Sequence, residues 1–193
     1  MTGEFDMPFV YRQVIDLNDL SLIGFDKTRF IEFSNARRSK TVHFFLDDYK
    51  FDEVWNKPDR QIGRLLQYKQ VLSPDFSTYI DMPEPLQIHN TFRNRWCAAV
   101  WQAAKMVVIP TISWGDENSY DFCFDGIEPG CVVAVSTIGT RMHHGGFMGG
   151  FSQMCRQIQP SAVLVYGTKH VGMDGLAPLI ELPYTHGSMI KND

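Results

Sequence analysis

Carboxylate side chains stand shortly after several apolar runs of this sequence, where they could take part in chemistry. Asp75, Asp48 and Asp116 each follow a run rich in β-branched or aromatic residues. At the end of a buried strand, a carboxylate such as Asp75 could orient a hydroxyl group, bind a metal ion or act as a general base. The alternative role for Asp75 is a turn cap, which the preceding Pro74 favours. Asp75 is therefore the candidate catalytic residue, and the turn cap stays open.

The same carboxylates offer oxygen ligands for a metal ion. Mg²⁺ prefers carboxylate oxygens and water, so Asp48 and Asp116 are candidate metal ligands near Asp75. Asp47 precedes Asp48 directly, and successive side chains of a strand face opposite ways, so only one of the two can point inward. Asp47 is therefore a candidate ligand-binding residue. Capping by these Asp residues, without any metal, remains the alternative.

A polar helix face supplies the next candidates. Gln87, Asn90 and Arg93 recur at helical spacing in one predicted helix, and a guanidinium group can fork onto a phosphate or a carboxylate. This pattern predicts a ligand-binding face. The alternative is that Arg93 pairs with an acidic strand-end residue such as Asp75 and holds the helix to the sheet.

A glycine-rich stretch follows the apolar run at residues 132–135. Thr137 and Gly139 begin it, and the glycines of residues 140–150 would let backbone N–H groups approach an anion. The stretch matches no nucleotide-binding fingerprint. We expect either a phosphate cradle or a flexible loop here, with the helix starting as late as Phe151.

Aromatic and imidazole side chains could contribute at the same strand ends. Trp114 and Tyr166 each follow an apolar run and are candidate contacts for a planar ligand, although core packing is the alternative for a Trp. His143 and His144 lack the spacing of a metal-binding motif, so we expect them at the surface.

The elements that must position these residues follow an alternating order. Apolar runs near residues 22–25, 41–46, 71–72, 107–109, 132–135, 163–165 and 179–182 predict strands, and most lack polar alternation. Such runs suit strands buried on both faces, joined by helical crossovers. Helices are predicted after Pro58, over residues 85–105, after Asp116 and before Pro160. We expect an α/β fold of alternating βα units with a mostly parallel sheet, either a small or incomplete TIM-like barrel or an open parallel sheet.

Length and composition limit the class of protein. The 193 residues suit a single α/β domain, with an irregular lead-in over residues 1–20 and a tail over residues 184–193. A net charge of −4 argues against coating nucleic acid. No run suits a membrane span and no secretory signal is evident, so we expect a cytoplasmic protein. The four cysteines form no C-x-x-C pair, and we expect them to be reduced and buried.

Several segments together resemble a known family. They are 73–77, 87–96, 108–114, 122–127 and 133–137, and they are similar to a bacterial and phage family catalogued as domain of unknown function 4417. The resemblance covers residues 22–167 and implies a cytosolic protein of bacteria, phages or mobile elements. It carries over no catalytic residue. The stretch from His143 to Gly150 departs from the charged helix start expected of the family.

These observations favour a phage or mobile-element protein, located in the cytosol of the bacterial host, that binds a small phosphorylated or nucleotide-like ligand at its strand ends. Whether it is an enzyme that transforms this ligand stays open, as does a magnesium cofactor. One alternative is an interaction protein that docks a host protein, or forms a homo-oligomer, through Met142, Phe147, Met148 and Phe151. Another is a nucleic-acid factor that uses Arg37, Arg38, Lys40, Arg60 and Arg64.

Overall fold

The structure is a computed structural model that describes residues 4–29, 39–140 and 143–184. It contains a four-stranded and a three-stranded sheet, and every strand pair is parallel. The first sheet has the order β1 (Ser21–Gly24), β2 (Lys40–His43), β3 (Gln70–Leu72), β4 (Val108–Ile109). The second has the order β5 (Val132–Ser136), β6 (Ala162–Tyr166), β7 (Leu179–Leu182). The predicted parallel α/β fold is confirmed.

The two sheets meet at one short junction. A parallel bridge joins Thr111 to Ala134, and Ala134 also donates its N–H to the carbonyl of Pro110 at 2.8 Å. Strand order therefore follows chain order from β1 to β7. Among the described residues no pairing joins β7 to β1, so the strands do not close into a barrel, and the open parallel alternative is the one observed.

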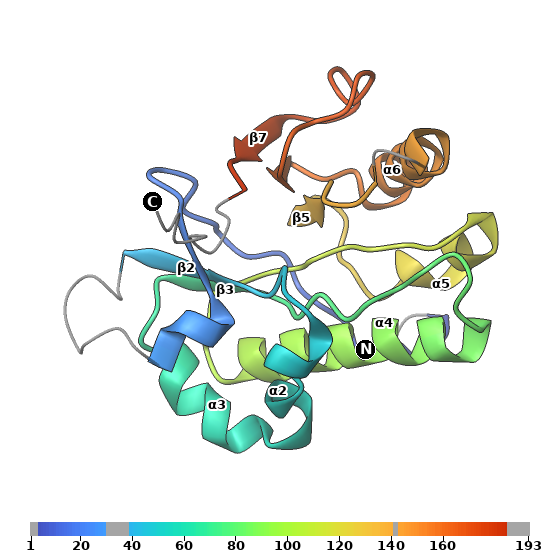
Figure 1. The fold of residues 1–193 in the computed structure, drawn as a ribbon. Helices are drawn as coiled ribbons and strands as arrows, with labels where there is room; N and C mark the ends of the chain where they lie inside the picture. The colour runs from blue at the N-terminus through green and yellow to red at the C-terminus, as the bar shows by residue number, and fades with distance from the viewer. Residues whose placement is uncertain (1–3, 30–38, 141–142, 185–193) are drawn as a thin grey trace, which may run out of the picture.

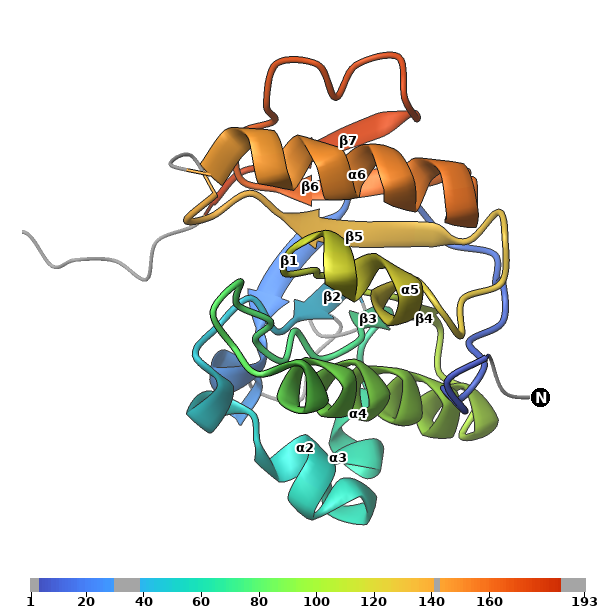
Figure 2. The ribbon, with the colours of Figure 1, turned by 90° about the vertical axis from the view of Figure 1, so that its right-hand side faces the viewer.

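Helices connect the strands. They are α2 (Glu53–Asn56), α3 (Pro58–Leu65), α4 (Glu84–Ala103), α5 (Tyr120–Cys123) and α6 (His144–Ile158), with 3₁₀ turns η1 (Phe25–Arg29), η2 (Asp48–Lys50) and η3 (Glu117–Ser119). Figure 1 shows α4 running below the first sheet. Figure 2 shows α4 and α6 both starting on the side toward which β5 points. The carboxyl ends of the strands and the starts of these helices therefore share one edge.

Neighbouring residues of each strand are buried on opposite faces. Val71 belongs to the core cluster that includes Trp101 of α4, whereas Leu72 packs in a second cluster with Ile109 and Leu164. The lead-in lines this second cluster through Ile15, Leu17 and Leu20. Because helices cover one face and the lead-in the other, the strands are apolar without alternation.

The start of α6 corrects the sequence analysis. A helix begins at His144, so residues 144–150 are neither a loop nor a non-helical phosphate cradle. Gly150 has no room for a side chain, because an added Cβ would clash with the indole of Trp114. The glycine thus permits close helix packing, which its helix propensity alone does not reveal.

Other predictions were nearly right or lie outside the described residues. The long helix covers Glu84–Ala103, close to the predicted 85–105, while β2 ends at His43 rather than at residue 46. All four cysteines are buried and free, as predicted. Predictions for Arg37, Arg38, Met142 and the tail from residue 185 fall on residues that are not described. No described helix has both the length and the apolarity that crossing a bilayer requires.

Candidate functional site

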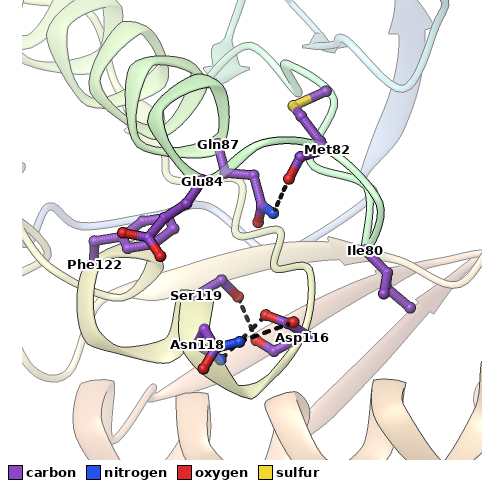
Figure 3. A pocket seen from close by; sticks show the side chains of 8 residues that line it. All are labelled: Ile80, Met82, Glu84, Gln87, Asp116, Asn118, Ser119 and Phe122. Atoms are coloured by element: carbon purple, nitrogen blue, oxygen red, sulfur yellow. Dashed lines mark hydrogen bonds between the residues drawn. The ribbon is translucent and has the colours of Figure 1, made fainter.

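A small pocket lies at the strand-end edge, between the start of α4 and the segment that follows β4. Its volume is about 200 Å³. Figure 3 shows the side chains that line it: Ile80, Met82, Glu84, Gln87, Asp116, Asn118, Ser119 and Phe122. Of the predicted site residues, Gln87 and Asp116 are among them. The loops after β3 and β4 thus build this pocket, as expected for ligand sites in parallel α/β proteins.

One polar face of α4 holds the segment that follows β3. Side-chain amides of Gln87, Asn90 and Asn94 donate to the backbone oxygens of Met82, Ser77 and Pro74, at 2.8, 2.6 and 2.6 Å. The predicted polar face exists, and its amides position the pocket wall.

Gln87 keeps one polar atom unused. Gln87 is 4% exposed, and its Oε1 is buried without a hydrogen-bond partner among the described residues. The Nε2 bond to Met82 fixes the amide, so Oε1 lies against Gly115, whose added Cβ would be 2.6 Å away. Buried polar atoms are nearly always paired, so Oε1 is one of the few exceptions among the described residues.

The opposite wall is a capped turn. Asp116 Oδ1 accepts the backbone N–H of Asn118 at 3.1 Å, and Oδ2 accepts from the Asn118 side chain at 3.1 Å. Ser119 Oγ donates to the carbonyl of Asp116 at 2.6 Å and accepts the N–H of Gly115 at 3.0 Å. Asp116 is therefore the cap of η3, as the turn alternative predicted.

A buried polar network anchors this edge from beneath. Ser73 Oγ donates to Asn94 Oδ1 at 3.0 Å, and Thr111 donates its N–H to Ser73 Oγ at 2.7 Å. Arg95 is 2% exposed and donates to Asn94 Oδ1 and to the carbonyls of Cys123 and Asp125. Burial lowers the pKa of the Arg95 guanidinium to about 10. The sequence analysis assigned no role to Arg95, because its partners are backbone carbonyls about thirty residues further along the chain, which leave no pattern in the sequence.

Asp75 lies next to this network but is not among the pocket-lining residues. It is half-buried, and burial, with the charge of Asp48, raises the pKa of its carboxyl group to about 7. Asp48 accepts the backbone N–H of Ser77 at 3.2 Å and its hydroxyl at 2.7 Å. A raised carboxyl pKa of this kind occurs at functional sites and in structural networks alike, so the catalytic role of Asp75 stays a prediction.

Arg93 and Asp47 form ion pairs. Arg93 lies 3.6 Å from Asp52, not paired with Asp75, and stacks 3.8 Å from the ring centroid of Phe76. It thus holds α4 to its neighbours, but its acidic partner differs from the one expected. Asp47 pairs with Lys50 at 2.9 Å.

The remaining predicted residues do not gather with Asp75 in a single pocket. Trp114 packs between Phe124 and Phe147, with ring centroids 5.9 and 5.1 Å away. Thr137 donates its N–H to the carbonyl of Tyr166 at 3.0 Å, and Gly139 has a φ of 78° in the turn that follows. None of these residues lines the pocket described above.

His43 was missed by the sequence analysis. It is 4% exposed at the end of β2, and its ring lies 5.0 Å from Tyr166 and 5.8 Å from Phe45. Burial lowers the pKa of His43 to about 4. The sequence analysis predicted a strand at His43, but not its contact with Tyr166 of β6.

Three histidines stand near the start of α6. His144 and His170 have ring centroids 4.9 Å apart, and His170 Nε2 lies 2.7 Å from Thr140 Oγ1. His143 and His144 are exposed, as expected. Within the described part of the chain, no three His, Cys, Asp or Glu residues come together as a metal-binding group.

The fold and pocket define an α/β protein with an open parallel sheet and a small polar pocket at its strand ends. The chain belongs to the family described as Domain of unknown function (DUF4417), which matches residues 1–181. No solved structure matches it.

Two relatives are mycobacteriophage proteins. The Gene 1 protein of Mycobacterium phage L5 is 41% identical over 135 residues, which cover 68% of this chain and 59% of that protein. The Gene 1 protein of Mycobacterium phage D29 is 41% identical over 181 residues, covering 86% of this chain and 67% of that protein. The matched region is thus about three fifths to two thirds of these relatives' length.

Proposed function

We propose that this is a phage protein that binds a small nucleotide-like ligand at its strand ends, in the cytosol of a bacterial host. One observation carries the proposal. The pocket at this edge is lined mainly by polar side chains, those of Glu84, Gln87, Asp116, Asn118 and Ser119. Concave sites with a few convergent polar groups are the usual form of small-molecule sites.

The pocket volume indicates what enters it. Pockets for drug-sized ligands usually have about 300–1,000 Å³, and this one has about 200 Å³. It suits one ring of a ligand rather than a whole nucleotide.

Charge indicates which part of the ligand enters. Among the described residues that line the pocket none is Lys, Arg or His, and Glu84 and Asp116 are acidic. A phosphate group in the pocket would face two carboxylates at close range, which is unfavourable. The phosphate of a nucleotide therefore stays outside, and the base or sugar enters.

Thermal unfolding with a panel of nucleosides and nucleotides tests the proposal. A ligand at one hundred times its Kd adds about 2.7 kcal/mol to the free energy of unfolding, which raises Tm by about 5–10 °C for a chain of this size. Ile80→Trp should abolish the rise by filling the pocket, since Ile80 is 52% exposed and lines it. Val14→Trp is the matched control at a position 94% exposed. A flat response of the wild type to every compound contradicts the proposal.

Docking of a host protein is a second candidate, favoured by a different observation. Tyr79, Ile80 and Leu86 are 60%, 52% and 52% exposed near the pocket. The docking surface predicted from the sequence is wrong in part, because two of its residues, Phe147 and Phe151, are buried. If docking is the function, no nucleoside raises Tm, and Leu86→Asp weakens binding of a purified host partner.

A nucleic-acid role has less support. Arg64 is already engaged, because it pairs with Glu53 at 3.2 Å and its guanidinium lies 4.3 Å from the ring centroid of Phe25.

A further inference from the structure

Three large apolar side chains are exposed on one short segment at the strand-end edge. Tyr79, Ile80 and Leu86 are 60%, 52% and 52% exposed, and they lie within residues 79–86, which lead into the first turn of α4. We call these three residues the exposed apolar surface. Ile80 also lines the pocket. Single exposed apolar residues are ordinary, but apolar groups gathered beside a hollow are typical of binding surfaces.

Hydrogen bonds fix this segment to the fold. The carbonyl of Tyr79 accepts the N–H of Met82 at 3.0 Å, and the Tyr79 hydroxyl donates to Ser77 Oγ at 3.0 Å. Asp48 accepts the Ser77 hydroxyl at 2.7 Å, and Asn90 of α4 donates to the Ser77 carbonyl at 2.6 Å. The backbone of the segment is therefore ordered before a partner binds, which lowers the entropic cost of association.

The charge around the exposed apolar surface is negative. The two segments that wall the pocket, residues 73–90 and 110–126, contain no Lys or Arg. Their acidic residues are Asp75, Asp81, Glu84, Asp116, Glu117, Asp121 and Asp125. A partner that approaches this edge therefore meets a negative potential.

Several of these carboxylates have no cation beside them. In other parts of the molecule exposed carboxylates are paired, as Asp16 is with Lys69 at 2.8 Å and Asp174 with Lys169 at 2.9 Å. Within the described part of the chain, no ion pair involves four exposed acidic residues of the pocket walls, which are Asp81, Glu84, Glu117 and Asp121. Cations of a partner could therefore approach them without displacing a resident Lys or Arg.

We infer that the exposed apolar surface docks a segment of another protein in which Arg or Lys side chains alternate with apolar ones. The inference rests on the docking role given above as the second candidate, and it needs no nucleoside in the pocket. Apolar side chains of the partner would cover Tyr79, Ile80 and Leu86, and its cations would lie beside the unpaired carboxylates. A guanidinium group suits both a carboxylate and the ring of Tyr79. A second copy of this chain or a nucleic acid would instead bring negative charge to a negative edge.

Fluorescence anisotropy with two short labelled peptides tests the inference on the full chain. Arginine alternates with leucine in the first peptide, and glutamate replaces every arginine in the second. We expect the arginine peptide to bind and the glutamate peptide not to bind. Raising the salt concentration from about 0.05 to 0.5 M should weaken binding of the arginine peptide, because salt screens exposed charges.

Removal of two carboxylates tests the part played by charge. Asp81→Asn combined with Glu84→Gln should weaken binding of the arginine peptide about threefold to tenfold. The matched control is Asp19→Asn combined with Asp59→Asn, which changes the net charge equally at exposed positions in the lead-in and in α3. A loss as large in the control would overturn the inference, because net charge alone would then explain binding.

Leu86→Ser tests the apolar part of the surface. It should weaken binding of the arginine peptide about fivefold or more, because a partly exposed leucine that a partner covers contributes to affinity. Leu66→Ser is the matched control, since Leu66 is 48% exposed at the end of α3. Equal binding by the two variants would contradict docking on residues 79–86.

The outcomes separate this inference from the ligand proposal. If neither peptide binds, or if both bind equally well, the inference fails, while thermal unfolding with nucleosides still tests the ligand site. If the arginine peptide binds as expected and no nucleoside raises Tm, the inference stands and the ligand proposal fails.

Discussion

Half-buried Asp75 and buried His43 make the free energy of unfolding depend on pH in opposite directions. This free energy falls with rising pH because of Asp75 and rises with pH because of His43. Burial raises the pKa of Asp75 to about 7 and lowers that of His43 to about 4. Both changes disfavour the charged form, because the surroundings solvate charge poorly. Each group therefore links the free energy of unfolding to pH over its own range.

Asp75→Asn should stabilise the protein at high pH. Unfolded chains lose the Asp proton near pH 4, while the folded protein keeps it up to about pH 7. The unfolded state then binds fewer protons, so stability falls as pH rises from about 4 to 7. We expect a gain of about 1–3 kcal/mol at pH 8 and little change at pH 4, measured by urea unfolding. Asp81→Asn is the control at an exposed carboxylate, and the same change at both pH values contradicts this account of Asp75.

His43→Asn should weaken the dependence of the free energy of unfolding on pH at acidic pH. The folded protein keeps His43 neutral down to about pH 4, whereas the unfolded chain takes up a proton near pH 6.5. Stability contributed by neutral His43 is therefore lost as pH falls from about 6.5 to 4. Asn keeps an acceptor near the N–H of Phe45, which His43 Nδ1 accepts at 3.3 Å. The slope of unfolding free energy against pH in this range is the readout, and an unchanged slope would exclude His43 as its source.

Residue types alone predicted only part of the site. Gln87 and Asp116 were proposed from helical spacing and strand-end position, and both line the pocket. The unpaired state of Gln87 Oε1 depends on which backbone oxygen takes Nε2 and on the contact with Gly115. Neither contact leaves a periodic signal in the sequence, so the chemistry of the pocket emerges only in three dimensions.

Helix α6 owes its position to its glycines and to Trp114. Tyr120 donates its hydroxyl to the carbonyl of Gly146 at 3.4 Å, and Gly150 faces the Trp114 indole. The ring of Phe147 packs on the same indole. Glycines that lower helix propensity were expected to delay the helix, but close packing against Trp114 compensates for that cost.

Two glycine substitutions in α6 should therefore have opposite effects. Gly150→Ala forces its Cβ against Trp114, and we expect a loss of about 1–3 kcal/mol from overpacking. Gly146→Ala meets nothing within 4 Å and should gain about 0.5–1 kcal/mol from the lower entropy of the unfolded chain. Thermal unfolding of the two variants measures the difference. Equal effects would mean that the Trp114 contact does not position α6.

The two sheets share a single core although only one short junction joins them. The cluster on the helix side includes Val42 and Val71 of the first sheet and Val133 and Val163 of the second. The second cluster, on the side of the lead-in, likewise contains Leu72 of the first sheet and Leu164 of the second. The molecule should therefore unfold as one cooperative unit.

Amide hydrogen exchange tests this cooperativity. We expect the slowest amides of β3 and β6 to exchange with the same free energy, equal to the global unfolding free energy. Leu164→Ala should lower both values together by about 2–5 kcal/mol. Protection lost in β5 to β7 alone would show two independent units instead.

The sequence predicted the parallel α/β fold because unalternating apolar runs and intervening helices are strong local signals. The sequence did not show whether the strands close into a barrel. Closure depends on contact between β1 and β7, which lie far apart in the chain, and here the lead-in residues Ile15, Leu17 and Leu20 cover the inner face. Apolar lead-in residues of this kind leave no distinctive composition, so the sequence did not distinguish a closed barrel from an open sheet.

A titration followed by two-dimensional ¹H–¹⁵N NMR tests the ligand site most directly, with adenosine added to the uniformly labelled protein. The largest shifts should occur at the Gln87 side-chain amide and at the backbone amides of Gly115, Asn118 and Ser119, and should saturate together with one Kd. Shifts confined to the start of α6 around His144, or no shifts at millimolar adenosine, would contradict a ligand pocket between α4 and η3.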